Sequence, residues 1–201
     1  MRRLRAALSG VLGLAMALSL AACSEDSTAG HYAADGGQFQ FHSPGGKTEI
    51  FYPEDERQEL PSFSGEDLMH EGKNISLDDY EGKIVVLNAW GQWCAPCRAE
   101  VDDLEAVQEE LEKSGQGTVL GINVRDHNRT VSQDFVKDNA VSYPSIYDPP
   151  FISAASLGGV PASVIPTTIV LDKQHRPAAV FLRSITEKDV LDVVRPMLEE
   201  S

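Results

Sequence analysis

The stretch IVVLNAWGQWCAPC, residues 84–97, decides the fold. Its first half is an almost unbroken apolar run, which predicts a central strand buried on both faces. Its second half carries the motif Trp93-Cys94-Ala95-Pro96-Cys97 and leads into residues with a helical pattern. The two cysteines therefore stand at a strand-to-helix junction, where unpaired backbone N–H groups and the helix dipole favour an anion. This placement favours the thiolate of Cys94, the species that attacks disulfides, and indicates thiol–disulfide exchange.

The rest of the chain alternates strand-like and helix-like segments. Apolar runs bounded by turn residues predict further strands, at residues 75–77, 119–124, 167–171 and 178–182. Apolar residues at helical spacing predict helices, at residues 97–111, 131–136, 151–157 and 187–200. We expect Pro196 to kink or shorten the last of these helices. This order predicts an α/β fold with a mixed central sheet flanked by helices on both faces.

The first 22 residues have the pattern of a secretory leader. Three arginines within residues 2–5 precede an uncharged apolar segment at residues 6–20, which is too short for a stable transmembrane span. The ending Leu20-Ala21-Ala22-Cys23 resembles a bacterial lipobox, whose cleavage leaves the cysteine as a lipidated N-terminus. An ordinary signal peptide followed by an incidental Cys23 is the alternative.

A change in composition divides the rest of the chain in two. Residues 23–47 are rich in Gly, Ala, Ser, Asp and His and predict a flexible tether. Residues 48–201 carry the predicted elements and form the expected folded domain. The formal net charge of −14 argues against nucleic acid and anionic lipid as partners, because phosphate binding needs clustered Lys and Arg.

The chain has three cysteines. If Cys23 carries lipid, Cys94 and Cys97 form the one remaining pair. The loop between them is too small for a disulfide to stabilise the fold by much, so the pair is expected to be a redox-active disulfide. A zinc site would need a second pair of ligands, and the histidines are scattered along the chain, so neither a metal nor another cofactor is expected.

The dithiol after a strand, the element order and the segment Ile165-Pro166-Thr167-Thr168 before another strand together resemble the thioredoxin fold. Within that fold the chain is most similar to the TlpA-like and ResA-like branch of membrane-tethered, extracytoplasmic thiol–disulfide oxidoreductases. The similarity extends from about residue 61 to residue 198. It rests on Gly82-Lys83, residues 87–90, residues 93–100 (WCAPCRAE) and the Pro-Thr segment.

The two cysteines have different expected roles. Cys94, at the start of the helix, is the predicted nucleophile, since its sulfur can be partly exposed there. Cys97 lies three residues further on, is expected to be more shielded, and is the predicted resolving residue that breaks the mixed disulfide. Pro96 limits the flexibility between them and loses no hydrogen bond near a helix start.

The resemblance also assigns an acid to the site. Glu100 matches a position at which ResA-like proteins use an acid to tune the cysteines and move protons; a solvated helix glutamate is the alternative. Thioredoxin has a buried Asp beneath the dithiol, but the matching residue here is Asn88, which cannot titrate. Glu100 is therefore the better candidate for general acid–base work. Residues 101–104 lack the proline usual in the family, and Asp102 and Asp103 are expected on a solvated face.

The same resemblance predicts a substrate-binding surface. Pro166 matches a cis-proline that faces the dithiol, with an ordinary trans proline as the alternative. The backbone of Ile165 would then pair with an extended substrate chain, and Thr167 follows at the same site. Trp93 is expected to cover the dithiol and shape the docking surface, whereas Trp90 is expected to pack in the core.

Together these features imply a lipid-anchored thiol–disulfide oxidoreductase on the outer face of the cytoplasmic membrane. The expected partners are the thiols and disulfides of client proteins and a membrane electron-donor thiol protein. The resemblance implies reduction of protein disulfides, with cytochrome c maturation as one setting. A dithiol oxidant that introduces disulfides into secreted proteins, a peroxide-reducing redoxin and a non-enzymatic tethered binding domain are the alternatives.

Overall fold

The computed structural model describes residues 37–199. The strands are β1 (Glu49–Phe51), β2 (Ser64–Asp67), β3 (Asn74–Ser76), β4 (Ile84–Trp90), β5 (Gly117–Asn123), β6 (Ser145–Tyr147), β7 (Thr167–Leu171) and β8 (Pro177–Phe181). The α-helices are α1 (Ala95–Ala99), α2 (Val101–Ser114), α3 (Arg129–Asp138) and α4 (Glu187–Glu199). Short 3-10 helices are η1 (Pro44–Gly46), η2 (Glu54–Glu56), η3 (Leu77–Tyr80) and η4 (Ile152–Ser156).

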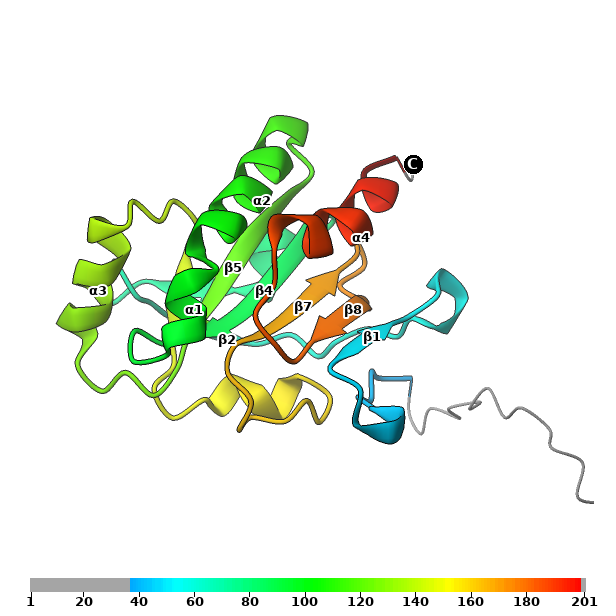
Figure 1. Cartoon of the computed structure of the whole chain (residues 1–201), viewed down its shortest axis with the longest axis horizontal. Coiled ribbons are helices and arrows are strands. Elements are labelled where there is room, and N and C mark those ends of the chain that lie inside the picture. The colour runs from blue at the N-terminus through cyan, green and yellow to red at the C-terminus, as the bar shows by residue number, and fades with distance from the viewer. Residues whose placement is uncertain (1–36, 200–201) are drawn as a thin grey trace, which may run out of the picture. The chain divides into compact units, whose positions relative to one another are not determined.

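The strands form one eight-stranded mixed sheet in the order β1-β8-β7-β4-β5-β6-β2-β3 (Figure 1). β4, β5 and β6 run parallel, and the other neighbouring strands are antiparallel. All seven residues of β4 are buried, which is what the apolar run predicts for a central strand. Because β4 lies between β5 and β7, the residues that follow it emerge in the middle of the sheet.

One face of the sheet is covered by α2 and α4, which pack against each other (Figure 1). Ile84 and Val86 of β4 belong to a buried cluster with Leu104 and Leu111 of α2 and Val194 of α4. Residues three or four apart share one face of a helix, so the spaced apolar residues of α2 and α4 form the faces that pack against the sheet. The predicted stripes are confirmed.

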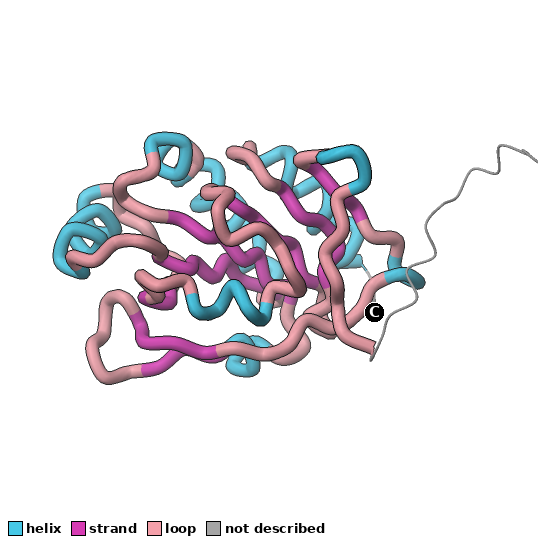
Figure 2. Tube along the Cα trace, turned by 90° about the horizontal axis from the view of Figure 1, so that it is seen from below, coloured by secondary structure: helices cyan, strands magenta, loops and turns pink. Residues whose placement is uncertain are grey.

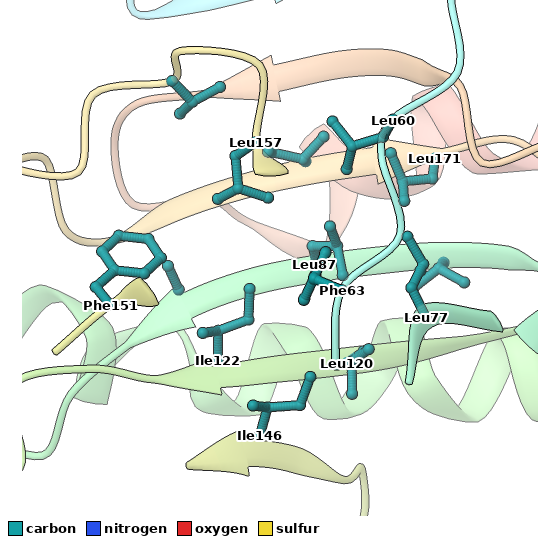
Figure 3. Packing of buried hydrophobic residues seen from close by; sticks show 14 of the residues in the cluster. Leu60, Phe63, Leu77, Leu87, Leu120, Ile122, Ile146, Phe151, Leu157 and Leu171 are labelled. Atoms are coloured by element: carbon teal, nitrogen blue, oxygen red, sulfur yellow. The ribbon is translucent and has the colours of Figure 1, made fainter. Parts of the chain in front are cut away.

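The opposite face is covered by the N-terminal segment, η3 and η4, and Figure 2 shows η4 lying across the strands. In Figure 3 the side chains of Leu87, Ile122 and Leu171 from the sheet lie in one buried cluster with those of Leu60, Phe151 and Leu157. Phe151 and Leu157 flank η4. Helices thus flank both faces as predicted, but the helices of this second face are short and of the 3-10 type. The chain has a thioredoxin-like α/β fold.

The observed elements differ from the predicted ones at three points. The helix after the dithiol is divided into α1 and α2 at Glu100, whose backbone (φ −97°, ψ 1°) departs from the α-helical range. β1, β2 and β6 lie outside the predicted strands, because segments of three or four residues carry almost no periodic signal. Pro196 lies on the exposed side of α4, which continues past it to Glu199.

The folded part begins earlier than the predicted boundary at residue 48. Phe39 is only 3% exposed, and its ring packs edge-on against Tyr52 at 5.3 Å. The N–H of Phe41 donates to the carbonyl oxygen of Gly158 at 2.6 Å. Residues 38–41 therefore belong to the fold and not to a tether. The composition of this segment does not indicate this, because polar residues surround the two aromatic residues. Residues 1–22 and Cys23 lie outside the described residues.

Phe39→Ala is expected to lower the free energy of unfolding by about 3–5 kcal/mol, because it empties a buried aromatic site. Phe51→Ala is the matched control: Phe51 is 57% exposed, and its loss should cost less than about 1.5 kcal/mol, the upper range of one aromatic pair. Denaturant unfolding of both variants measures the difference. Equal and small losses would show that residues 38–41 do not contribute to the fold.

No helix within residues 37–199 is long and apolar enough to cross a bilayer.

Candidate active site

Cys94 and Cys97 form a disulfide directly after the central strand, with their Cα atoms 5.3 Å apart. Cys94 is the N-cap of α1, and the backbone N–H of Cys97 points at its sulfur from 3.2 Å. An N–H donor at this position stabilises negative charge on the Cys94 sulfur once the disulfide is reduced. The two cysteines are 3% and 2% exposed, so the predicted contrast in exposure between them is not present in this oxidised form.

What distinguishes the two cysteines is their surroundings. The Cys94 sulfur lies 3.8 Å from the carbonyl oxygen of Ile165, on the loop that precedes β7. Cys97 faces inward and borders a cavity of about 10 Å³ that is also lined by Asn88, Trp90 and Tyr143. Cys94 is thus next to a loop at the surface, and Cys97 is next to the interior.

The loop beside Cys94 contains the cis peptide bond Ile165–Pro166. It reaches the dithiol because β7 pairs with β4 in a register that sets Ala89 opposite Thr167. The Thr167 side chain is buried, and its hydroxyl donates to the carbonyl oxygen of Val164 at 2.8 Å. Thr167 therefore holds the loop in shape, whereas Ile165 is partly exposed and presents its backbone beside the sulfur.

Glu100 is buried, with 1% exposure, and the alternative of a solvated helix glutamate is wrong. One carboxylate oxygen accepts a hydrogen bond from the Asn88 side-chain amide at 3.0 Å, and the other accepts from the backbone N–H of Ile185 at 3.0 Å. Asn88 also donates to the Thr168 hydroxyl at 3.1 Å. Since Asn88 lines the same cavity as Cys97, it connects the surroundings of the acid with those of the inner cysteine.

Burial raises the pKa of Glu100 from its ordinary 4.5 to about 7, because an apolar environment disfavours the charged carboxylate. The hydrogen bonds from Ile185, Asn88 and Ser184 lower this pKa in part, and the nearby charge of Asp103 raises it further. A carboxyl group with a pKa near neutral pH can both release and accept a proton under physiological conditions. Glu100 therefore has the properties of an acid–base group.

Trp93 directly precedes Cys94. It is 44% exposed, and its indole N–H donates to the carbonyl oxygen of Val124 at 3.0 Å. Gly91 makes room for it, since a Cβ at residue 91 would collide with the indole ring. Trp90 is 5% exposed, as expected for a core residue, and its ring packs against Phe135 of α3 at 5.5 Å.

Several residues that support the site were missed in the sequence. The hydroxyl of Ser184 donates to the carbonyl oxygen of Pro96 at 3.2 Å, and Ile185 binds Glu100. Asp126 accepts from the N–H of Gln92 at 2.7 Å and so fixes the loop before the dithiol. The one signal available was that Asp126 follows a buried strand, where polar residues often gather at a site. Nothing local in the sequence places Ser184 or Ile185 beside residues 96–100.

Asp103 also differs from expectation. It accepts a hydrogen bond from the backbone N–H of Glu187 at 2.8 Å, at the first turn of α4. An acid at that position satisfies an N–H that has no partner within the helix. Asp102 is exposed, as expected for a solvated face.

Comparison with known proteins agrees with this geometry. The model of the AhpC/TSA family matches residues 57–176. The chain is 31% identical over 144 residues to the thiol–disulfide oxidoreductase ResA of Bacillus subtilis (strain 168). This match covers 70% of this chain and 76% of ResA.

Solved structures give the same result. A secreted thiol–disulfide isomerase from Corynebacterium glutamicum is 68% identical, with a TM-score of 0.80 over 82% of this chain and 100% of that protein. A DsbF homologue from Corynebacterium diphtheriae is 65% identical, with a TM-score of 0.76 over 80% of this chain and 99% of that protein. The chain belongs to the AhpC/TSA family and is a thioredoxin-like thiol–disulfide oxidoreductase of the ResA type.

Proposed function

We propose that the protein is anchored to the outer face of the cytoplasmic membrane and that its reduced dithiol attacks disulfides of other proteins there. The observation that carries the proposal is the position of the Cys94 sulfur, 3.8 Å from the carbonyl oxygen of Ile165 at a partly exposed loop. A client chain that lies extended along this loop can pair with the Ile165 backbone and bring its own sulfur to Cys94. Trp93 and Pro96 form the adjoining surface.

The chemical steps follow from this arrangement. The Cys94 thiolate attacks one sulfur of the client disulfide, forms a mixed disulfide and releases the other client sulfur as a thiolate. Cys97 then gives up its proton, for which the Glu100 carboxylate is the proposed acceptor, and attacks the Cys94 sulfur. The client leaves as a dithiol, reduced by two electrons, and the Cys94–Cys97 disulfide remains. A membrane thiol protein is the proposed donor of the two electrons that reduce it again.

Two observations support the location. Residues 1–22 have the pattern of a leader, and Cys23 stands where a lipobox cysteine would stand. The similar protein from Corynebacterium glutamicum is described as secreted. Attachment of lipid to Cys23 would keep the domain beside a membrane donor, and residues up to about 37 would span the distance.

The direction of exchange depends on the reduction potential of the Cys94–Cys97 pair. Equilibration of the purified protein with glutathione or dithiothreitol buffers measures it. The proposed reduction of client disulfides requires a reduction potential well below about −200 mV, and we expect such a value. A value near about −120 mV would contradict this direction and identify a dithiol oxidant.

Cytochrome c maturation is the setting that the ResA resemblance implies. The matching test client is a peptide that contains a Cys-x-x-Cys-His disulfide, since this motif is the site of haem attachment. The reduced protein should reduce this peptide.

A further inference from the structure

Two exposed arginines, Arg98 and Arg125, lie near the disulfide. Arg98 directly follows Cys97, and its guanidinium donates to the carbonyl oxygen of Gln92 at 2.7 Å. Arg125 follows β5, donates to the carbonyl oxygen of Ala162 at 2.7 Å and lies with its guanidinium carbon 5.7 Å from the centre of the Trp93 ring. Gln92 belongs to the loop before the dithiol, and Ala162 to the loop that leads to the cis-proline. Both guanidinium groups therefore bind loops that lie beside the dithiol in the chain or at the cis-proline.

The charge of these two arginines is not neutralised within the folded domain. Arg57, Arg129, Arg176 and Arg183 each form an ion pair with a carboxylate. Within residues 37–199, Arg98 and Arg125 form no ion pair with a carboxylate, and their guanidinium groups donate to backbone carbonyl oxygens. A carbonyl oxygen orients a guanidinium but carries no net charge, so both groups keep a full positive charge toward solvent.

The rest of the rim contributes no exposed acid. The rim segments 91–99, 124–128 and 160–167 contain one acidic residue, Asp126. Asp126 is only 8% exposed, and its side chain is occupied by the N–H of Gln92 and the amide of Asn123. These three segments therefore carry two exposed cations and no exposed acid, although the whole chain has a formal net charge of −14.

The backbone of Arg125 adds a separate indication. Its φ of 59° lies in the left-handed region, which is unfavourable for a residue with a side chain. Such conformations are concentrated at functional sites, where the surrounding structure maintains them. Here this conformation accompanies the placement of the guanidinium over Trp93 and on Ala162, beside the dithiol.

We propose that this rim selects client segments that carry Asp or Glu next to the reacting cysteine. The inference rests on the proposed function and names its substrate class. An extended client that pairs with the Ile165 backbone has its neighbouring side chains over the rim, where carboxylates meet Arg98 or Arg125 and basic side chains are repelled. Since both arginines are exposed, the selection is moderate and is weakened by salt.

The test compares two peptide disulfides that differ only in the residues beside the cysteine, Glu-Cys-Glu and Lys-Cys-Lys. The rate constant for reduction of each peptide by the reduced protein is divided by the rate constant for its reduction by dithiothreitol, which corrects for the intrinsic reactivity of the disulfide. We expect the corrected rate to be about 3- to 10-fold higher for the acidic peptide at low ionic strength. The ratio should approach one in about 0.5 M salt, where the Debye length is only a few ångströms.

Three variants make the assignment specific. The double variant Arg98→Gln with Arg125→Gln should lose the preference, because glutamine keeps a polar, hydrogen-bonding side chain but carries no charge. Arg98→Lys with Arg125→Lys should retain most of it. Lys113→Gln, which removes a charge at the far end of α2, should leave the preference unchanged.

The possible failures are distinguishable. Equal corrected rates for the two peptides in the wild-type protein, or a preference that survives in the double glutamine variant, would overturn the proposed rim and leave the exchange function intact. A reduced protein that reduces neither peptide would contradict the proposed function itself, and the rim proposal with it.

Discussion

Cys94→Ser abolishes disulfide reduction: in the purified protein, we expect the rate of insulin-disulfide reduction to fall by about 10³-fold or more. A loss of this size is in the range known for a missing nucleophile. A serine hydroxyl in this setting is not ionised near neutral pH and cannot form a mixed disulfide. The N–H of Cys97, 3.2 Å from the sulfur, would then face a neutral oxygen. Reaction of stoichiometric amounts of reduced protein with insulin, followed by thiol counting, measures the rate without interference from added reductant.

Cys97→Ser is the matched control, because it removes the other sulfur of the same pair. This variant should still attack the client with Cys94 but should stop at the mixed disulfide, which non-reducing electrophoresis detects. Added dithiothreitol should release the client from it. If Cys94→Ser instead formed the stable mixed disulfide and Cys97→Ser were inert, the assignment of the two roles would be reversed.

The sequence predicts the centre of this protein better than its periphery. β4, the dithiol and the start of the helix form one continuous stretch, so local pattern and motif suffice to place Cys94 and Cys97. The strands at 167–171 and 177–181 likewise carry strong apolar runs. Ile165 and Cys94 are 71 positions apart in the chain, and the pairing of β7 with β4 brings them together. This proximity was predictable only through the resemblance to a family.

The burial of Glu100 shows where sequence reasoning ends. Its spacing from Cys97 predicts a position one helical turn away, but the same spacing fits a solvated side chain. What decides the matter is the loop after β8, which brings the N–H of Ile185 to the carboxylate. That loop is 85 positions distant, and its sequence carries no motif. The resemblance to the family thus suggests the role of Glu100, whereas its burial can be established only from the three-dimensional structure.

Glu100→Gln should change the pH dependence of the second chemical step. In the wild-type protein, release of the client from the mixed disulfide should show an inflection near pH 7, since burial raises the pKa of Glu100 to about 7. The glutamine cannot take up the proton of Cys97, so this inflection should disappear, and the rate near pH 7.5 should fall by about 10²-fold. Rapid-mixing measurements of client release between pH 5 and 9 provide the test.

Stability provides a second readout of the same substitution. Because the pKa of Glu100 is raised from 4.5 to about 7, the folded protein holds a proton that the unfolded chain has released between these two values. The free energy of unfolding of the wild-type protein should therefore decrease with rising pH in this window, by at most about 3 kcal/mol. Glu100→Gln removes this decrease, so its stability relative to the wild type should rise from pH 4.5 to 7 and stay constant above.

The amide can replace both hydrogen bonds of the carboxylate, those to Ile185 and Asn88. Its oxygen can accept from the N–H of Ile185. If the Asn88 amide turns by 180°, its oxygen can accept from the nitrogen of the substituted side chain, and the Thr168 hydroxyl then donates to Asn88 instead of accepting from it. Glu109→Gln is the matched control, because Glu109 lies on α2 at the surface and pairs with Lys113. It should change neither the pH profile nor the pH dependence of stability. If Glu100→Gln kept the wild-type inflection and the wild-type slope, the carboxyl of Glu100 would not be the group that titrates near neutral pH, and the proton of Cys97 would have to leave by another route.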